Sequence, residues 1–414
     1  MDPDEPPARQ DRFTRRSFLQ FWPAALAAVG IAPALRAAGQ ETRASGGDPG
    51  PVNPGLDAQN PDSTVPPLTD VGGVPAFKYP FSLAYKRVFN GGWSREVTVR
   101  ELPVSKSIAG VNMRLTAGGV RELHWHAAGE WAIMLYGAAR ITAVDADGKS
   151  FVADVKKNDL WYFPTGIPHS IQGLGPDGAE FLLVFDDGSF SEFATVLLSD
   201  TMAHTPREVL AKNFAVAEQA FAGLPQKELF IFQAEPPGPL EADRKAAAGS
   251  LGSSPQDFAY RTMDYPVTKR TKGGEVRIVD SKNFKASTTM AAAIVTVRPG
   301  GLRELHWHQN ADEWQYFISG KGRMTVMAAA GKSRTMDFEA GDVGYVQQTV
   351  PHYVENTGDT DLVFLEMFKS GAYQDLSLSE WLAHTPPELV RAHLHIDQAT
   401  FDAMPKDRTV VAPV

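Results

Sequence analysis

The stretch Arg121-Glu122-Leu123-His124-Trp125-His126 occurs twice in this sequence, and it decides the fold. It returns letter for letter as Arg303-Glu304-Leu305-His306-Trp307-His308. Two further pairs recur about 180 residues apart: Pro168-His169 with Pro351-His352, and Ala203-His204-Thr205-Pro206 with Ala383-His384-Thr385-Pro386. Near-constant spacing over this distance indicates a duplicated domain.

Each half of the chain is predicted to form short strands followed by a helical segment. Val111–Leu115 and Ile133–Ile141 alternate in hydrophobicity, and glycines and Asp-Gly pairs separate such runs. Thr205-Pro206-Arg207-Glu208 and Thr385-Pro386-Pro387-Glu388 have the pattern of a capping box with proline in the first helical turn. We therefore expect an all-β fold of two tandem jelly-roll β-barrels, each with a short helical C-terminal extension.

The composition excludes several classes of protein. Of the 414 residues, 43% are hydrophobic and 21% charged, which is enough to build packed cores. The formal net charge of -9 argues against nucleic acid as a partner. The chain has no cysteine, so it contains no disulfide, no zinc–thiolate site and no cysteine nucleophile.

The N-terminus has the layout of an export signal. Arg15 and Arg16 precede a mildly apolar stretch, Phe21–Leu35, and small residues at Ala37-Ala38 offer a cleavage site. The paired arginines indicate the twin-arginine pathway, which exports folded proteins to the periplasm or the exterior. A stable membrane anchor is the alternative, but the stretch is short and contains two prolines.

These signals divide the chain into five parts. They are a twin-arginine signal peptide (1–38), a Pro/Gly-rich arm (39–70), a first barrel domain (71–235), a linker (236–254) and a second barrel domain (255–414). We expect the arm to be extended and, in a multimer, to pack across a neighbouring subunit.

Histidine and glutamate are spaced in each copy as metal ligands would be. His124 and His126 project to the same face of an extended strand. Glu130 follows after a turn and returns on a later strand, and His169 arrives from further along. The second copy repeats this arrangement with one more residue before its glutamate. The two predicted sites are His124, His126, Glu130, His169 and His306, His308, Glu313, His352.

Three imidazoles and one carboxylate hold a divalent first-row metal and leave coordination positions open for a substrate. Since no sulfur ligand is present, manganese or iron is the expected occupant and zinc is less favoured. The remaining histidines are interpreted as structural or incidental; they are His204, His384, His393 and His395.

The pattern around these residues resembles the two motifs of the cupins, which are metal-binding jelly rolls, and their doubled form, the bicupins. Further segments resemble bacterial oxalate decarboxylases: Ser94–Pro103, Asp159–Pro164, Phe185–Glu192 and Glu313–Tyr316. This resemblance covers nearly all of the chain after the signal and the arm. It implies two Mn²⁺ ions per chain, dioxygen as a co-substrate, oxalate as the substrate and a hexameric assembly.

The resemblance also implies roles for particular residues. Arg121 corresponds to the arginine that orients oxalate, and Glu192 to the glutamate of a mobile lid that moves a proton. Arg303 and Glu366 correspond to a buried pair beside the second metal. The expected reaction is therefore decarboxylation of oxalate to formate and carbon dioxide.

The sequence departs from the family in the lid, where Ser191-Glu192-Phe193-Ala194-Thr195 replaces Ser-Glu-Asn-Ser-Thr. This keeps open a second activity, oxalate oxidase, which yields hydrogen peroxide and carbon dioxide. A non-catalytic manganese-binding bicupin is a third interpretation. Smaller departures are Asn158 in place of glycine, Gly173 in place of asparagine and Gln347 in place of proline.

Overall fold

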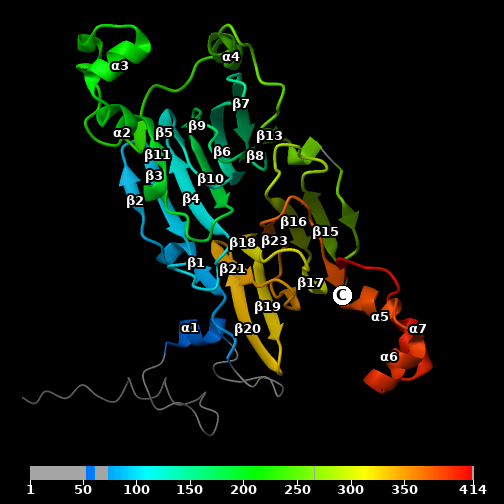
Figure 1. Ribbon diagram of the computed structural model, residues 1–414. Helices are drawn as coiled ribbons and strands as arrows, with labels where there is room; N and C mark the ends of the chain where they lie inside the picture. The colour runs from blue at the N-terminus through cyan, green and yellow to red at the C-terminus, as the bar shows by residue number, and fades with distance from the viewer. Residues whose placement is uncertain (1–52, 61–72, 265, 413–414) are drawn as a thin grey trace, which may run out of the picture. The chain divides into compact units, whose positions relative to one another are not determined.

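The computed structural model describes residues 53–60, 73–264 and 266–412 (Figure 1). Within these residues the named strands pair into three sheets of twelve, seven and six strands. The expected all-β class with helical extensions is confirmed. The signal predicted for residues 1–38 lies outside the described part. No helix of the described residues is long and apolar enough to cross a membrane.

The first half of the chain builds the twelve-stranded sheet. Eleven of its strands come from this half: β2 (Arg87–Phe89), β3 (Gly92–Val97), β4 (Ala109–Leu115), β5 (Gly119–Trp125), β6 (Glu130–Val144), β7 (Ser150–Lys156), β8 (Leu160–Phe163), β9 (His169–Gly173), β10 (Ala179–Phe185), β11 (Val196–Leu197) and β12 (Ile231–Gln233). The long strand β6 pairs with β8 and β10 along its first part and with β7 and β9 along its second. Both parts of the sheet therefore close around one interior.

The second half repeats this plan in two sheets. Its strands are β14 (Lys269–Arg270), β15 (Gly274–Val279), β16 (Ala291–Val297), β17 (Leu302–Trp307), β18 (Glu313–Ser319), β19 (Lys321–Ala328), β20 (Lys332–Glu339), β21 (Asp342–Val346), β22 (His352–Asn356), β23 (Leu362–Phe368), β24 (Leu376–Ser377) and β25 (Val411–Ala412). The seven-stranded sheet runs from β1 through β21, β18, β23, β16 and β15 to β14. The other sheet contains β17 and β22, which carry the histidines.

The two halves exchange edge strands. Strand β1 (Lys78–Pro80) pairs with β21, and β13 (Ala259–Tyr260) pairs with β8. Each half thus lends one short strand to a sheet of the other, across the boundaries predicted at 235 and 255. One hydrophobic core continues through both halves and contains three fully buried tryptophans, Trp131, Trp161 and Trp314. This continuity positions the two candidate sites in one rigid framework.

The helical extensions follow β11 and β24. They consist of α2 (Leu198–Ala203), α3 (Arg207–Phe214) and the short 3-10 helix η4 (Glu218–Phe221) in the first half, and of α5 (Leu378–Ala383), α6 (Pro387–Leu394) and α7 (Gln398–Ala403) in the second. The predicted capping boxes are wrong. Helices α3 and α6 take Pro206 and Pro386 as N-caps without a side-chain cap. The threonine hydroxyls donate backwards to Thr201 and Trp381 carbonyls, which closes the preceding helices instead.

Two segments expected to be irregular contain helices. In the arm, α1 (Pro54–Gln59) is capped by the Asn53 side chain, and Lys78 Nζ donates to Gln59 Oε1 at 2.9 Å. In the linker, α4 (Leu240–Ala248) lies beside β7 (Figure 1). Arg140 Nη1 reaches Asp243 Oδ2 at 2.5 Å and fixes α4 to strand β6. The linker is therefore packed against the first barrel.

Candidate metal centres

Each predicted ligand lies at the end of a strand. His124 is the penultimate residue of β5, His126 follows the end of that strand, Glu130 begins β6 and His169 begins β9. The second group has the same placement on β17, β18 and β22. His124 pairs directly with His169, and His306 with His352, across neighbouring strands. The turn that the spacing required before each glutamate is therefore present in both halves.

All eight predicted ligands come together in two groups of four. In each group the candidate ligand atoms lie within 4.8 Å of one another, and every side chain is buried. Glu130 Oε2 lies 3.1 Å from His126 Nε2 and 3.4 Å from His169 Nε2. In the second group, Glu313 Oε2 lies 2.7 Å from His352 Nε2.

The backbone fixes the tautomer of all six histidines. Every Nδ1 atom lies 2.6–3.1 Å from a main-chain carbonyl oxygen. A carbonyl only accepts, so Nδ1 must donate and the neutral ring has its lone pair on Nε2. The Nε2 atoms are the ones that face the glutamate in each group. Six lone pairs are thus directed toward two points, as metal ligands must be.

Buried atoms at both points lack hydrogen bonds within the described residues. They include Glu130 Oε1, His169 Nε2, His306 Nε2 and His352 Nε2. Buried polar atoms are almost always paired, so a cluster of converging unpaired lone pairs indicates a cation-binding site. The donor set contains nitrogen and oxygen only, which suits manganese or iron. The residues present therefore fit the metal that the family pattern implies.

Burial favours the neutral form of three ligand imidazoles, those of His124, His169 and His306, by lowering their pKa. Burial, followed by the charge of Arg121, holds the pKa of His124 well below its usual range, and burial with Arg303 does the same for His306. Burial alone would raise the pKa of Glu130, but the facing His169 and His126 outweigh it and lower the pKa below its ordinary value. Neutral imidazoles and an ionised carboxylate are the forms that bind a metal.

A break in strand register brings an arginine to the same interior. The pairing of β5 with β9 shifts between Arg121 and His124, and β17 shifts at the equivalent place. In a regular strand, residues three apart face opposite sides, so this irregularity allows both side chains to point inward. Arg121 and Arg303 are both buried.

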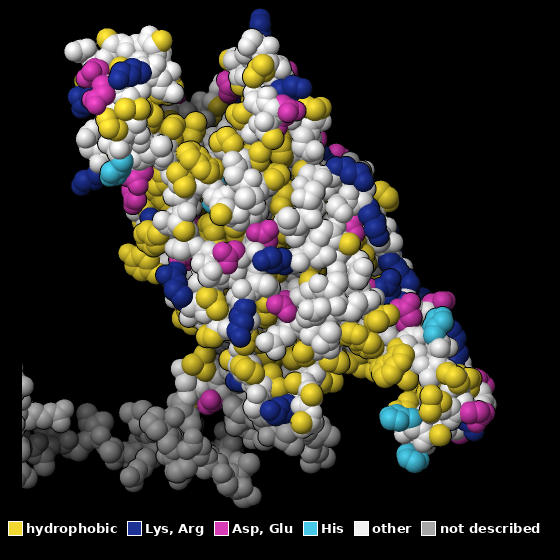
Figure 2. All heavy atoms as spheres, in the orientation of Figure 1, with side chains coloured by type: hydrophobic (Ala, Val, Ile, Leu, Met, Phe, Trp, Pro, Cys, Tyr) yellow, Lys and Arg dark blue, Asp and Glu magenta, His cyan; other side chains and the backbone are white. Residues whose placement is uncertain are grey.

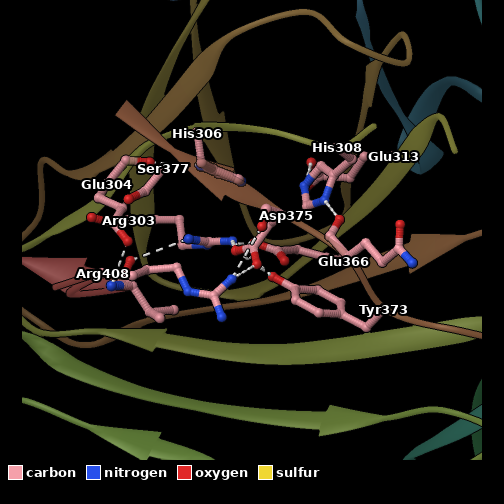
Figure 3. Close-up of polar contacts among 12 residues, drawn as sticks. Arg303, Glu304, His306, His308, Glu313, Glu366, Tyr373, Asp375, Ser377 and Arg408 are labelled. Carbon is pink, nitrogen blue, oxygen red and sulfur yellow. Dashed lines mark hydrogen bonds and ion pairs between the residues drawn. The ribbon is translucent and has the colours of Figure 1, made fainter. Parts of the chain in front are cut away.

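The two arginines have very different partners. Arg303 donates to Glu366 at 3.1 Å, to Asp375 at 3.0 Å and to the Tyr373 hydroxyl at 2.9 Å, as Figure 3 shows. Arg121 donates within the described chain only to the Phe230 carbonyl, at 3.2 Å. Burial therefore lowers the pKa of Arg121, whereas Tyr373, Glu366 and Glu313 overcome burial and raise that of Arg303. The first arginine is a buried cation with unused donors.

The segment predicted to form the lid directly precedes β11, which pairs with β5 at Trp125 and at His124 of the first group. A single turn of 3-10 helix, η3 (Glu192–Ala194), is capped by the Ser191 side chain. Glu192 is 3% exposed, and its Oε2 accepts a hydrogen bond from Ser94 Oγ at 2.8 Å. Burial raises the pKa of Glu192 despite the opposing charge of Arg121. The predicted lid carboxylate is therefore held inside, on the side of Arg121.

The chain was compared with known families, curated proteins and solved structures. The Cupin family model matches residues 83–221 and 264–402. Oxalate decarboxylase OxdC of Bacillus subtilis is 54% identical over 86% of this chain and 92% of its own length. The chain belongs to the bicupin oxalate decarboxylase family. A probable oxalate decarboxylase of Arthroderma benhamiae is 39% identical over 87% of this chain and 89% of its own length.

The fold of this oxalate decarboxylase family member also matches solved structures. A structure of the Bacillus subtilis enzyme, from work on its Mn(II) centres, superposes with a TM-score of 0.84 at 53% identity, covering 87% of this chain and 95% of that chain. A structure of the same enzyme at pH 4.6 has the same TM-score and covers 94% of that chain. One departure from the family pattern is explained: Asn158 has a φ of 72°, a left-handed conformation that asparagine tolerates better than most residues.

Sequence reasoning missed two residues that support each site. Glu122 is buried beside His124 and accepts hydrogen bonds from the main-chain N–H groups of Ser199 and Leu229, at 3.1 and 2.9 Å. It also accepts from the N–H of Phe230 at 2.5 Å. Phe230 adopts a left-handed φ of 56°, and its carbonyl accepts from Arg121. Glu304 and Val410 repeat this arrangement in the second half. The sequence contained one signal for this role, because Glu122 and Glu304 occupy the same place in the repeated hexapeptide.

Proposed function

We propose that this protein decarboxylates oxalate to formate and carbon dioxide, with Mn²⁺ and dioxygen, at the group formed by His124, His126, Glu130 and His169. The second group, His306, His308, Glu313 and His352, is proposed to hold a second Mn²⁺. The observation that carries the assignment of the first group is the contrast between Arg121 and Arg303. Relatives named as oxalate decarboxylases, one of them 54% identical, support the reaction.

Substrate binding is assigned to Arg121. Oxalate is a small anion, and a planar guanidinium can donate two parallel hydrogen bonds to its carboxylate. The pKa of Arg121 is lowered mainly by burial, so an arriving anion would restore the stabilisation that burial removes. Arg303 already donates to two buried carboxylates, Glu366 and Asp375, and these occupy the donors that an oxalate would need. We assign Arg303 and Glu366 a supporting role beside the second metal.

Proton transfer is assigned to Glu192. Manganese, when bound, supplies together with dioxygen the one-electron oxidation that weakens the carbon–carbon bond. Glu192 then accepts the proton of hydrogen oxalate and, after carbon dioxide leaves, returns it to the carbon of the departing formate. The electron withdrawn at the start returns to that carbon with the proton, so hydrogen oxalate is converted to carbon dioxide and formate with no net oxidation. The raised pKa of Glu192, caused by burial, brings it closer to a value at which it can both take and give a proton.

The second candidate function is oxalate oxidase, which the departure of the lid residues Phe193-Ala194 from the family pattern keeps open. That reaction turns oxalate, dioxygen and two protons into two molecules of carbon dioxide and one of hydrogen peroxide. A non-catalytic manganese-binding protein is the third. Metal analysis of the purified protein, with formate and peroxide counted per oxalate consumed, separates the three. Formate near one per oxalate supports decarboxylation, peroxide near one supports oxidation, and unchanged oxalate refutes both.

Export and assembly are part of the same proposal. Arg15 and Arg16 support twin-arginine export to the periplasm or exterior, and N-terminal sequencing of the exported protein tests a cut near Ala38. A homo-oligomer, as a hexamer, is supported by apolar side chains exposed on the helical extensions (Figure 2). They include Val209, Phe214, Trp381 and Leu389. Light scattering coupled to gel filtration measures the assembled mass.

A further inference from the structure

An arginine outside the metal group contacts two residues of the lid segment. Arg87, on the edge strand β2, lies with its guanidinium carbon 4.2 Å from the ring centre of Phe193 and 3.9 Å from that of Phe230. Its Nη1 atom lies 3.8 Å from Glu192 Oε2. Nη1 is buried and donates no hydrogen bond within the described residues. Arg87 therefore contacts both the carboxylate of the lid and the aromatic residue beside it.

These contacts join the lid to the substrate-orienting arginine. The guanidinium carbon of Arg121 lies 4.0 Å from the Phe230 ring centre. Aromatic rings and guanidinium groups thus alternate in a series of contacts that runs from Phe193 through Arg87 and Phe230 to Arg121. In the second half Val410 occupies the place of Phe230 and provides no ring. The series is a property of the first site.

The lid has few other restraints on its outer side. Phe193 is 70% exposed, and η3 is a single turn. On the buried side, the Glu192 N–H donates to Glu96 Oε2 at 3.2 Å and the Glu192 carboxylate accepts from Ser94 Oγ at 2.8 Å, while the remaining bonds of η3 are local. An exposed phenylalanine gains little from burial, so the guanidinium beneath it is the main stabilising contact of that side chain.

We propose that Arg87 is a positioning residue that holds the lid closed with Glu192 directed into the first site. The ring of Phe193, in place of the asparagine of the family pattern, provides the face on which the guanidinium lies. Opening the lid would separate Arg87 from Phe193 and Glu192 together. This inference rests on the proposed role of Glu192. It implies that Phe193 stabilises closure, the state that favours formate over peroxide.

The test measures two quantities: amide hydrogen exchange in the lid, and the amounts of formate and peroxide formed per oxalate. Both are measured on the manganese-loaded wild type and on four variants, Arg87→Met, Phe193→Asn, Phe193→Tyr and Lys86→Ala. Lys86 is the matched control, because it lies 4.5 Å from the Trp93 ring on the same edge and does not contact the lid. Arg87→Met and Phe193→Asn should speed exchange of the amides of residues 192–195 by about fivefold, the size expected for one partly buried cation–aromatic contact. Phe193→Tyr and Lys86→Ala should match wild type.

Product formation should follow the same order. In Arg87→Met and Phe193→Asn, kcat for formate should fall by about fivefold and peroxide per oxalate should rise, with a smaller change in KM. Unchanged lid exchange in Arg87→Met, or equal acceleration in Lys86→Ala, would overturn the positioning role whatever the activity. If wild type releases no formate, the proposed function fails. The exchange data would still decide whether Arg87 holds the lid.

Discussion

Replacing each arginine of the repeated hexapeptide by methionine should have opposite consequences for stability and activity. Arg303→Met leaves the fully buried Glu366 without its ion-pair partner, whereas the buried Asp375 keeps Arg408. Removing one partner of a buried ion pair costs about 3–5 kcal/mol, because the remaining charge is uncompensated. Arg121→Met removes one hydrogen bond and one contact with an aromatic ring, a loss of about 1–2 kcal/mol.

These free energies translate into measurable shifts. Unfolding entropy is about 2.1 cal/mol/K per residue, so 3–5 kcal/mol over the described chain corresponds to a fall in Tm of about 4–7 °C. The Arg121 variant should lose about 1–3 °C on the same scale. Its formate production should fall at least about a hundredfold, because oxalate loses its orienting donor. Arg303→Met, if it keeps manganese, should retain most of its activity at low temperature.

The assay is thermal unfolding and formate release on the same preparations, with manganese per chain measured for each. A matched pair, Arg121→Lys and Arg303→Lys, tests geometry at constant charge. If the two methionine variants lowered the Tm equally, this would refute the claim that Arg303 stabilises the fold much more than Arg121 does. Full formate production by Arg121→Met would refute the binding role of Arg121.

Three further predictions address the lid, the metal and the support of the first strand. Glu192→Gln keeps the size of the side chain but not its proton, so formate should fall at least about a hundredfold at unchanged manganese content; full formate release would contradict this. After chelation, Tm should decrease as the pH falls from about 7 to 5. Burial lowers the folded-state pKa of His124, His169 and His306, so the unfolded chain binds more protons in that range; a Tm independent of pH would contradict it. Glu122→Ala removes the acceptor of the Ser199 and Phe230 N–H groups and one of the two acceptors of the Leu229 N–H, and should cost about 2–4 kcal/mol and weaken manganese binding. Unchanged metal affinity would show that the segment carrying Phe230 does not support His124.

The sequence was sufficient to predict the metal groups because their geometry is local and repeated. Strand alternation places His124 with His126, and a turn of either length can return a glutamate to them. The helical extensions were predicted, but not how they begin. Thr205 donates backwards to Thr201 because a short helix, α2, ends directly before it, and the pattern alone contains no signal for that helix.

The partners of the arginines could not be predicted from the hexapeptides, which are identical. Those partners come from segments that the repeat does not preserve. Phe185 pairs with the ligand Glu130 in the first half, and Phe368 pairs with the ligand Glu313 in the second, so the two phenylalanines are equivalent. Two residues before them, the first half has Leu183 and the second half has Glu366. The family resemblance supplied Glu366 as the partner of Arg303, and the strand pairing adds that a leucine stands at the equivalent place in the first half.

The connection after that strand completes the difference between the sites. Between β23 and β24 the chain runs only from 369 to 375, and this short path brings Tyr373 and Asp375 onto Arg303. Between β10 and β11 it runs from 186 to 195, three residues longer, and forms the turn that carries Glu192. The longer path places a carboxylate near Arg121 without a hydrogen bond between them. One site thus has an arginine saturated by protein, and the other has a guanidinium with unused donors and a nearby carboxylate to which it does not donate. Duplication supplied two equal metal groups, and the length of one connection, with one leucine in place of a glutamate, makes the first the catalytic candidate.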